Sequence, residues 1–296
     1  MIRTAISPRF ATSSLGRFVG VFVTRVSFSP AASSTTPPRE EPDVLTRDDL
    51  VEVLAAITVT APVRSDEVTR STNATAVALA EAGEPEWTLV AAAHQTEGKG
   101  RLGRSWSDVP DGSLLFSFVL RPELAPARTG LLSLLAGAEM ANAIRATTGR
   151  RVTCTWPNDL ILHDGKVGGV LLEASVVASA VRYVVVGIGV NLEPPHDVPG
   201  AGGIGSAVGQ RELLRAFFMR FAAAYTAAEV AFPQRVRSAW LSMSSTVGQV
   251  VRAKTLDGRE VTGRAVGIDD FGSLLLSTDR GEARVTYGEV EHLGSG

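Results

Sequence analysis

Apolar residues recur in two patterns that alternate through most of this chain. In one they return every three or four positions, which predicts amphipathic helices; in the other they form short continuous runs, which predict buried strands. Helices are expected at 45–56 behind Thr46, at 71–82 behind Ser71 or Thr72 and before Gly83, at 131–147 before Gly149, across Leu213, Leu214, Phe217, Phe218 and Phe221, and from Pro233 through Trp240. Strands are expected at 88–93, 113–120, 152–156 and 182–190, with a hairpin over 160–174 that turns at Asp164-Gly165. This mixture predicts an α+β fold.

The pattern changes after Val247. Short apolar segments are there separated by Asp257-Gly258, Asp269–Gly272 and Asp279–Gly281, which are the turn residues of a small β-barrel. A chain of 296 residues with 45% hydrophobic content is long enough for an enzyme core and a small second domain. We therefore expect a main domain at 45–246 and a second domain at 247–296, after an N-terminal extension at 1–44.

The extension has a composition of its own. From Met1 to Arg39 the only charged residues are arginines, and serine and threonine are frequent. This composition resembles an organellar transit peptide; a disordered segment or a misassigned start is the alternative. In either case the segment is left out of the fold.

Charge and cysteine content narrow the function classes. A formal net charge of −2 offers no source for the phosphate attraction that dominates nucleic-acid binding, so no nucleic-acid partner is expected. The single cysteine, Cys154, excludes an internal disulfide framework and a structural zinc site, and it fits a reducing, cytoplasmic location. No apolar run approaches the ~20 residues that cross a bilayer, so no membrane partner is expected.

A polar loop from Gln95 to Trp106 carries the first candidate chemistry. It contains three glycines and three cations, a combination that lets backbone approach a ligand and lets positive charge meet phosphate or carboxylate. The alternative is a surface loop whose cations are merely solvated. Gly98, Gly100 and Gly103 match the spacing of a dinucleotide fingerprint, but no helix opens behind them, which argues against that fold.

Two further clusters follow the loop. Trp156-Pro157-Asn158-Asp159 precedes the predicted hairpin, and Lys166-Val167-Gly168-Gly169 follows its turn. Strand rise places Asp159 ~13 Å from the hairpin tip, which suits a long ligand held at both ends; an ordinary turn with polar flanks is the alternative. Gly187, Gly189 and Asn191 end a buried strand, where glycine permits close approach and the amide can hydrogen-bond.

Taken together, these motifs resemble biotin protein ligases, in the form that lacks an N-terminal DNA-binding domain. The resemblance rests on the order and spacing of Ser71-Thr72-Asn73, the Gln95–Trp106 loop, Trp156 to Asp159, Lys166 to Gly169, and Gly187 to Asn191. It runs from about Ser65 to the C-terminus. It implies a mixed-sheet catalytic domain of the biotin/lipoate ligase type, followed by an SH3-like barrel.

The resemblance also implies roles for individual residues. Biotin would be bound by Ser71, Thr72, Gln95, Lys99, Gly100, Arg101 and Lys166, with Asn73 beside them. Trp106 would pack on adenine, or else be a core aromatic. ATP or the adenylate would be contacted by Arg104, Asn158, Asp159 and Asn191, with Asp159 acting through Mg²⁺. The binding set is completed by Gly98, Gly168 and Gly189. Arg101, Lys166 and Asp159 are the expected catalytic residues.

The implied reaction has two steps. The biotin carboxylate attacks the α-phosphate of ATP to give biotinyl-5'-AMP, and a lysine of the acceptor then attacks this mixed anhydride while the glycine-rich loop covers it. The implied acceptor is the biotin carboxyl carrier protein or domain of a biotin-dependent acyl-CoA carboxylase. A monomer or weak homodimer is expected.

Three positions depart from the family pattern. Lys99 replaces an arginine and Glu97 a small residue, which removes a bidentate guanidinium and adds an anion beside it. Thr155 stands where the family commonly has lysine. These departures leave open a biotin-binding protein without activity.

Related enzymes of the same fold offer competing interpretations. A lipoate ligase would share the chemistry, but the loop resembles the biotin branch, and residues 1–64 are not expected to form the winged helix of a ligase that doubles as a repressor. Cys154 could serve as the nucleophile of an octanoyl transferase, although a buried structural thiol is the preferred interpretation. His94 and His163 are given no role.

Overall fold

The computed structural model describes residues 44–163, 165–225, 229–255, 258–286 and 288–293. Residues 1–43 lie outside the described residues; they include the whole segment from Met1 to Arg39 that resembles a transit peptide and all but one residue of the expected extension at 1–44. The turn residues Asp164 and Asp257 also lie outside. Among the described residues, no helix is both long and apolar enough to span a bilayer.

A seven-stranded mixed sheet forms the centre of the main domain. Its strands are β1 (Val63–Thr69), β2 (Leu89–Gln95), β3 (Ser113–Leu120), β4 (Thr153–Thr155), β5 (Asp159–Leu162), β6 (Gly165–Val177) and β7 (Ala180–Asn191). They lie in the order β1-β2-β3-β7-β6-β5-β4. Only β1 and β2 pair in parallel, and every other neighbouring pair is antiparallel. The expected α+β class with a mixed sheet is confirmed.

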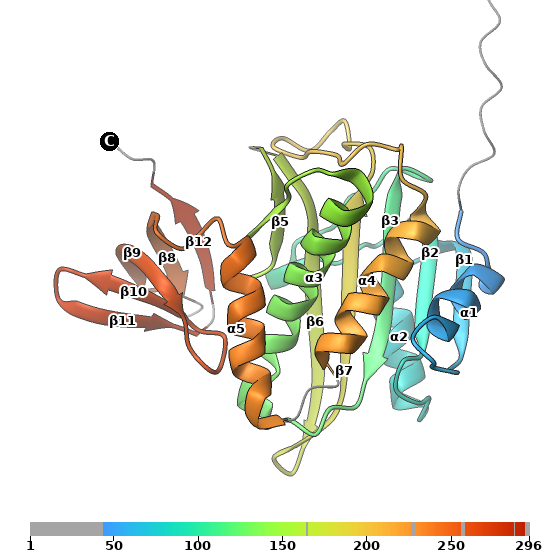
Figure 1. Ribbon diagram of the computed structural model, residues 1–296, viewed down its shortest axis with the longest axis horizontal. Coiled ribbons are helices and arrows are strands. Elements are labelled where there is room, and N and C mark those ends of the chain that lie inside the picture. Colours follow the sequence, from blue (N-terminus) through green and yellow to red (C-terminus); the bar gives the residue numbers. More distant parts are fainter. Residues whose placement is uncertain (1–43, 164, 226–228, 256–257, 287, 294–296) are drawn as a thin grey trace, which may run out of the picture. The chain divides into compact units, whose positions relative to one another are not determined.

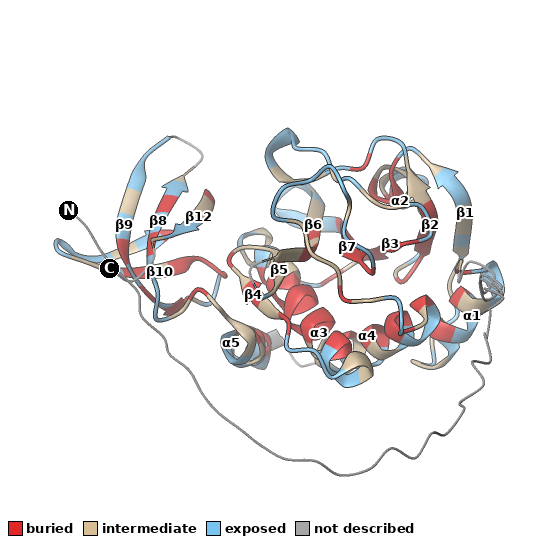
Figure 2. Ribbon diagram, turned by 90° about the horizontal axis from the view of Figure 1, so that it is seen from above, coloured by how far each residue is buried: buried red, intermediate tan, exposed pale blue. Residues whose placement is uncertain are grey.

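Helices cover the two faces of this sheet unequally. Figure 2 shows α1 (Arg47–Ala55), α3 (Gly130–Thr148), α4 (Gln210–Tyr225) and α5 (Phe232–Met243) on one side, and α2 (Thr72–Glu81) on the other. Aromatic rings fill the first side: Trp87, Phe116 and Phe118 pack against Phe217 and Phe221 of α4 at centroid distances of 5.2–6.2 Å. Because both faces of β3 are covered, all of its residues are buried.

Local sequence accounts for the helix ends. The Thr46 side chain accepts a hydrogen bond from the backbone of Asp49, whose carboxylate bonds back to the Thr46 backbone, so a complete capping box opens α1. Gly149 ends α3 in the left-handed conformation at φ 72°, which glycine adopts without steric cost. Ser71 precedes α2 as expected, but its side chain makes no capping hydrogen bond.

The C-terminal part is an antiparallel five-stranded sheet (Figure 1) of β8 (Val250–Thr255), β9 (Glu260–Ile268), β10 (Leu274–Thr278), β11 (Gly281–Val285) and β12 (Gly288–His292). The order is β11-β10-β9-β8-β12. This sheet is consistent with an SH3-like domain. Among the described residues its end strands β11 and β12 do not pair with each other, so it is open and not the closed barrel that the turns suggested.

Trp156 and its neighbours join the two parts. The buried Trp156 ring donates from Nε1 to the Gly272 carbonyl at 3.0 Å, and its backbone N–H donates to Thr246 Oγ1 at 3.0 Å. Thr155 Oγ1 lies 2.8 Å from Ser245 Oγ. Thr155, which stands where the family commonly has lysine, therefore contacts the segment that leads to the C-terminal sheet.

Candidate active site

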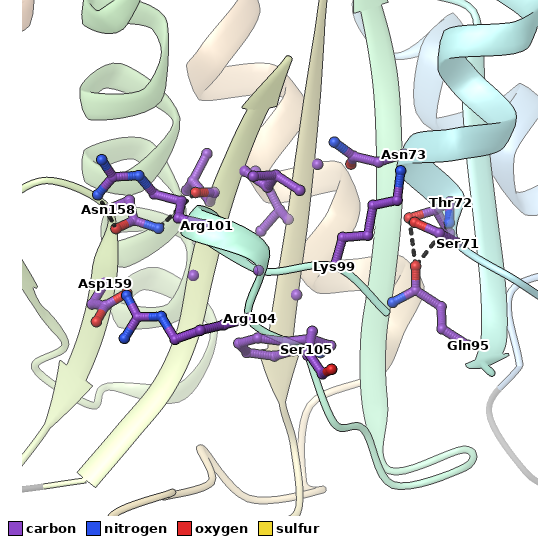
Figure 3. A pocket seen from close by; sticks show the side chains of 18 of the residues that line it. Ser71, Thr72, Asn73, Gln95, Lys99, Arg101, Arg104, Ser105, Asn158 and Asp159 are labelled. Carbon is purple, nitrogen blue, oxygen red and sulfur yellow. Dashed lines mark hydrogen bonds between the residues drawn. The ribbon is translucent and has the colours of Figure 1, made fainter. Parts of the chain in front are cut away.

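One cavity gathers most of the expected site residues on the α2 side of the sheet (Figure 3). It encloses about 700 Å³ of space, including its open mouth. Its lining comprises Ser71, Thr72, Asn73, Gln95, Lys99, Gly100, Arg101, Arg104, Ser105, Trp106, Asn158, Asp159, Lys166, Gly169, Val170, Leu171, Gly187, Ile188 and Gly189. Segments more than a hundred residues apart thus meet at one place, and the cavity is the candidate active site.

The wall of the cavity next to α2 carries uncharged hydrogen-bonding groups, and the Lys99 side chain extends toward it from the loop. The Thr72 backbone N–H donates to Gln95 Oε1 at 2.7 Å, and Thr72 Oγ1 lies 3.1 Å from the same oxygen (Figure 3). The Ser71 hydroxyl is buried and has no hydrogen-bond partner among the residues that the structure describes. A buried hydroxyl without a partner is costly, so this wall is suited to a ligand that supplies polar groups of its own.

Asn73 is held behind this wall by two partners. Its Nδ2 donates to Glu173 Oε2 of β6 at 2.9 Å, and its Oδ1 lies 2.7 Å from Ser117 Oγ of β3. A Cβ added to Gly187 would lie 1.6 Å from Asn73 Oδ1. Glycine at position 187 is therefore what gives Asn73 its space.

Trp106 lines the cavity and lies on β7. A Cβ added to Gly189 would lie 2.6 Å from the Trp106 ring, so the indole rests directly on the backbone of that strand. In the described part of the chain, its Nε1 has no hydrogen-bond partner. Trp106 therefore lines the cavity and is not a residue of the hydrophobic core.

The far end of the cavity is ionic. Lys166 Nζ lies 2.7 Å from Asp159 Oδ1 and 6.0 Å from the centre of the Trp106 ring. Gly169 lies directly against this pair, since an added Cβ would be in van der Waals contact with Lys166 Cε at 3.6 Å and with Asp159 Oδ1 at 3.7 Å. The sequence suggested that Asp159 and the hairpin tip contact opposite ends of a ligand. For Lys166, which follows the tip, this is wrong, because its side chain contacts Asp159 directly. A β-bulge at Leu160/Ile161 shifts the register, and Lys166 reaches back to Asp159.

Arg101 stands beside this ion pair. Its NH1 donates to Asn158 Oδ1 and to the Gly288 carbonyl of β12, each at 3.3 Å. Burial lowers the pKa of the Arg101 guanidinium, with nearby Arg104 acting in the same direction, whereas Asp159 opposes the shift. A guanidinium stays charged regardless, so the burial increases its attraction for an anion at this end.

The glycine-rich loop is folded back on itself. Lys99 and Ser105 form an isolated antiparallel bridge, and the Trp106 N–H donates to the Gly98 carbonyl at 2.8 Å. Leu102, between the two arginines, has φ 55° and is 55% exposed. The loop thereby directs Lys99 toward α2 and Arg101 toward Asn158, as Figure 3 shows.

Glu97 has a partner of its own. Its carboxylate accepts from Nε and NH2 of Arg70 at 2.9 and 2.6 Å, a bidentate pair on the protein surface. This pairing lowers the pKa of Glu97. The added anion is therefore paired with Arg70 on the surface, and the charge of Lys99 contributes a smaller part of the same pKa shift.

Three expected residues do not line the cavity, and their positions explain why. A Cβ added to Gly98 would lie 2.4 Å from the Trp106 carbonyl oxygen, and one added to Gly168 would lie 2.8 Å from the Gly189 carbonyl oxygen. Both glycines therefore allow close backbone packing. The buried Asn191 donates to the Gly202 carbonyl at 3.2 Å, and its Oδ1 has no partner among the described residues. All three are adjacent in sequence or in contact with residues that line the cavity or with the segment that follows β7.

Sequence reasoning missed several residues around the cavity. Val170, Leu171 and Ile188 line it and are indicated by the sequence only as strand core, and Ser105 carries no signal beyond its place in the loop. Ser117 and Glu173 act from behind the wall, and no local pattern marks them.

The remaining candidates fall outside the cavity. Cys154 is fully buried; its burial, with a smaller effect from the Glu139 carboxylate, raises its pKa to about 12, which argues for a structural thiol. His94 Nδ1 lies 2.8 Å from Asp108 Oδ2, and His163 is in the exposed hairpin turn.

Comparison with known proteins matches two family models. Residues 66–191 match the Biotin/lipoate A/B protein ligase family, and residues 246–293 match the Biotin protein ligase C terminal domain. The biotin--[acetyl-CoA-carboxylase] ligase of Paracoccus denitrificans is 35% identical over 236 residues, which cover 75% of this chain and 97% of that protein. The chain belongs to the biotin protein ligase family.

Further relatives agree with this membership. The bifunctional ligase/repressor BirA of Bacillus subtilis is 32% identical over 235 residues, covering 76% of this chain and 72% of its own. The structure of the Aquifex aeolicus biotin protein ligase in complex with biotin and ATP superimposes with a TM-score of 0.63 at 26% identity, covering 79% of this chain and 99% of that one. These biotin ligases identify the chain as a biotin ligase enzyme and favour biotin over lipoate.

Proposed function

We propose that this ligase joins biotin to ATP as biotinyl-5'-AMP and then transfers the biotin to a lysine of a biotin carboxyl carrier domain of a biotin-dependent carboxylase. The observation that carries this proposal is that one cavity has a wall of hydroxyl and amide groups next to α2 and a cluster of Arg101, Lys166 and Asp159 at its other end. Biotin has a corresponding arrangement, with a neutral cyclic urea at one end and a carboxylate at the other. The bound ligands of the Aquifex aeolicus ligase, biotin and ATP, are consistent with it.

The wall next to α2 would bind the urea. Ser71, Thr72 and Gln95 offer hydroxyl and amide groups there, and the buried Ser71 hydroxyl would gain the partner it lacks. The carboxylate would then point past Trp106 toward the cations at the other end of the cavity. Lys99, directed toward α2, would line the path between the two ends.

The cationic end would perform the first step. A biotin carboxylate oxygen attacks the α-phosphorus of ATP, the bond to the β-phosphate bridging oxygen breaks, and pyrophosphate leaves. Arg101 and Lys166 would stabilise the charge that develops on the phosphoryl oxygens, because both are held in place before the reaction by Asn158 and Asp159. The Asp159 carboxylate, 2.7 Å from Lys166 Nζ, would also hold Lys166 beside the phosphate.

The nucleotide would extend along the loop and the end of β7. Trp106 would pack on the adenine, and Arg104, Asn158 and Asn191 would contact the phosphates or the nucleoside. In the second step the ε-amine of the acceptor lysine attacks the acyl carbon, AMP leaves and the amine loses a proton. The loop from Gln95 to Trp106 would shield the mixed anhydride from water.

Mg²⁺ would enter with ATP. No cluster of three or more His, Cys, Asp or Glu side chains suited to a metal occurs among the described residues, but Asp159 provides one carboxylate at the ionic end. One carboxylate fits an ion that keeps most of its ligands from phosphates and water. Asp159 would hold the ion, which would supply positive charge at the phosphates.

The wider assignments rest on the same proposal. Residues 45–246 would be the catalytic domain and 247–296 the SH3-like domain, and the reaction would take place in the cytoplasm, where ATP and the carrier are available. The chain would act as a monomer or weak homodimer without a nucleic-acid or membrane partner.

Biotin transfer to a purified carrier domain with magnesium ATP tests the proposal. Wild type should transfer biotin, whereas Arg101→Ala and Lys166→Ala should lose about 10²–10³-fold in rate, the usual effect of removing a preorganised electrostatic group. Arg145→Ala, at an exposed position of α3, is the matched control and should retain the wild-type rate.

Two further measurements distinguish this proposal from its rivals. Pyrophosphate release on adding biotin and ATP without carrier reports adenylation alone; biotin binding without release would establish a binding protein that has no activity. Lipoate in place of biotin should give no release. Release with lipoate but not with biotin would refute the assignment of substrate.

A further inference from the structure

One buried carboxylate beside the glycine-rich loop takes no part in the proposed reaction. Asp108 follows the loop and does not line the cavity; its side chain is 1% exposed, whereas that of its partner His94 is 35% exposed. His94 Nδ1 lies 2.8 Å from Asp108 Oδ2, and the Gln95 backbone N–H donates to Asp108 Oδ1 at 3.4 Å. His94 and Gln95 end β2, where the loop begins. Asp108 therefore joins the two ends of the loop at its base.

The proton between the two side chains belongs to His94. A carboxylate only accepts, so Nδ1 of the imidazole carries the hydrogen and donates it to Asp108. A buried carboxylate is costly unless it is paired and hydrogen-bonded, and among the described residues His94 is its one side-chain donor. Without this donor, the Asp108 carboxylate would have to move out to water.

The outgoing arm of the loop, residues 96–99, is anchored independently of Asp108. The N–H groups of Thr96 and Glu97 donate to the carbonyls of Thr69 and Arg70, at 2.9 and 2.8 Å. Thr69 is the last residue of β1, so this arm is fixed to the neighbouring strand. A movement of Asp108 would leave it in place.

The returning arm, residues 104–108, depends on Asp108 for its position. Trp106 lies two residues before Asp108, so their Cα atoms are at most ~7 Å apart. The Trp106 ring rests on Gly189 of β7, and its backbone N–H donates to the Gly98 carbonyl within the loop itself. A movement of Asp108 toward water would therefore lift the indole from β7.

We infer that Asp108, held by His94, is a positioning residue for nucleotide binding: the pair keeps the returning arm at the end of β2 and thereby keeps Trp106 on β7. This inference rests on the proposed function, in which adenine packs on Trp106. The pair touches neither substrate and acts through the indole. Biotin binding is nearly independent of it, because the Gln95 side chain keeps its bond to the Thr72 backbone.

Two His94 variants separate the hydrogen bond from the volume of the ring. His94→Asn keeps an N–H donor near the position of Nδ1, whereas His94→Phe keeps a ring and has no donor. The KM for ATP in pyrophosphate release should rise by about 10-fold in His94→Phe, the loss expected for one hydrogen bond to a charged group, and by no more than about 3-fold in His94→Asn. In both variants kcat at saturating ATP, and biotin affinity by isothermal titration, should stay within about 2-fold of wild type.

A second substitution guards against a folding defect in His94→Phe. Asp108→Ala removes the carboxylate together with its need for a partner, and it should raise the KM for ATP by a similar factor. The double variant should be no weaker than the worse single variant, since both changes break one contact. The matched control is His196→Phe, the same replacement at an exposed position outside the cavity, which should leave KM and kcat unchanged.

Limited proteolysis of the ligand-free protein tests the anchoring without any substrate. Trypsin cleaves after Lys99, Arg101 and Arg104 when the loop is open, and the rate follows the population of the open loop. His94→Phe should therefore be cleaved about 10-fold faster than wild type, and His94→Asn no more than about 3-fold faster.

Each contrary result overturns the inference. An unchanged KM for ATP in His94→Phe would show that the pair does not act on the nucleotide, whatever the rate of cleavage. Equal losses in His94→Asn and His94→Phe would show that the ring acts and not the hydrogen bond. Additive losses in the double variant, or an equal loss of biotin affinity, would leave only a general structural role. Wild type that releases no pyrophosphate would refute the proposed function and with it the nucleotide role, and proteolysis would still decide whether the pair anchors the loop.

Discussion

Gly187→Ala should disturb the cavity through a single atom. The added Cβ would lie 1.6 Å from Asn73 Oδ1 and 2.7 Å from Asn73 Cγ, so the oxygen would have to retreat by about 1.8 Å to reach the 3.4 Å at which such contacts become ordinary. A shift of this size breaks the hydrogen bonds of Asn73 to Glu173 and to Ser117. One of them involves a charged group, so we expect a loss of about 2–4 kcal/mol in the free energy of unfolding. In a chain of this size that loss lowers the melting temperature by about 5–10 °C.

Thermal unfolding and biotin titration of the same samples measure this effect. The matched control is Asn73→Ala, which removes the obstructing oxygen: in that background Gly187→Ala should cost no more than about 1 kcal/mol, because the two changes share one contact. A melting temperature and a biotin affinity equal to those of wild type in Gly187→Ala would refute the packing argument. An equal cost of Gly187→Ala in both backgrounds would refute the assignment to Asn73.

Three further predictions concern other parts of the protein. Cys154 should resist thiol reagents at pH 8 in the native protein and react in denaturant. The thiol ionises near pH 9.0 when unfolded and has a pKa of about 12 when folded, so its contribution to stability is present below pH 9 and is lost as the pH rises to 12. Cys154→Ala should flatten that part of a curve of unfolding free energy against pH. Biotin with ATP should slow tryptic cleavage of the glycine-rich loop, and Glu97→Gly should speed cleavage of the free protein by releasing Arg70; equal cleavage with and without ligand would contradict loop ordering. Thr155→Lys, which restores the common family residue, should lower the melting temperature by about 2–4 °C because it removes the contact with Ser245, and an unchanged melting temperature would contradict this.

Elements with a strong local signal could be predicted from the sequence. The apolar run of β3 gave the observed bounds, Ser113–Leu120, and Gly149 gave the end of α3. Strand β1 was missed because Val63–Thr69 is mostly polar and lies at the edge of the sheet, where its structure depends on parallel pairing with β2. The turn residues also could not predict that the C-terminal sheet is open, because they indicate strands but not whether the end strands pair with each other.

The site could be predicted as a set of motifs but not as a set of contacts. The motifs place most of the cavity lining, because glycine, amide and cation each have a local reason to occupy their positions. The partners that hold them come from distant strands: Glu173 for Asn73, and the bulge that brings Lys166 to Asp159. Ordinary strand residues carry no mark of such a role, since the role exists only once the strands are in register.

The burial of Cys154 has a practical consequence for following motion in this enzyme. The chain contains no other cysteine, and this one is inaccessible in the native state. A cysteine introduced at the exposed Leu102 would therefore be the only accessible thiol, without any prior removal of native ones. A fluorophore or spin label attached there would report the opening and closing of the glycine-rich loop in solution, in a protein otherwise of natural sequence.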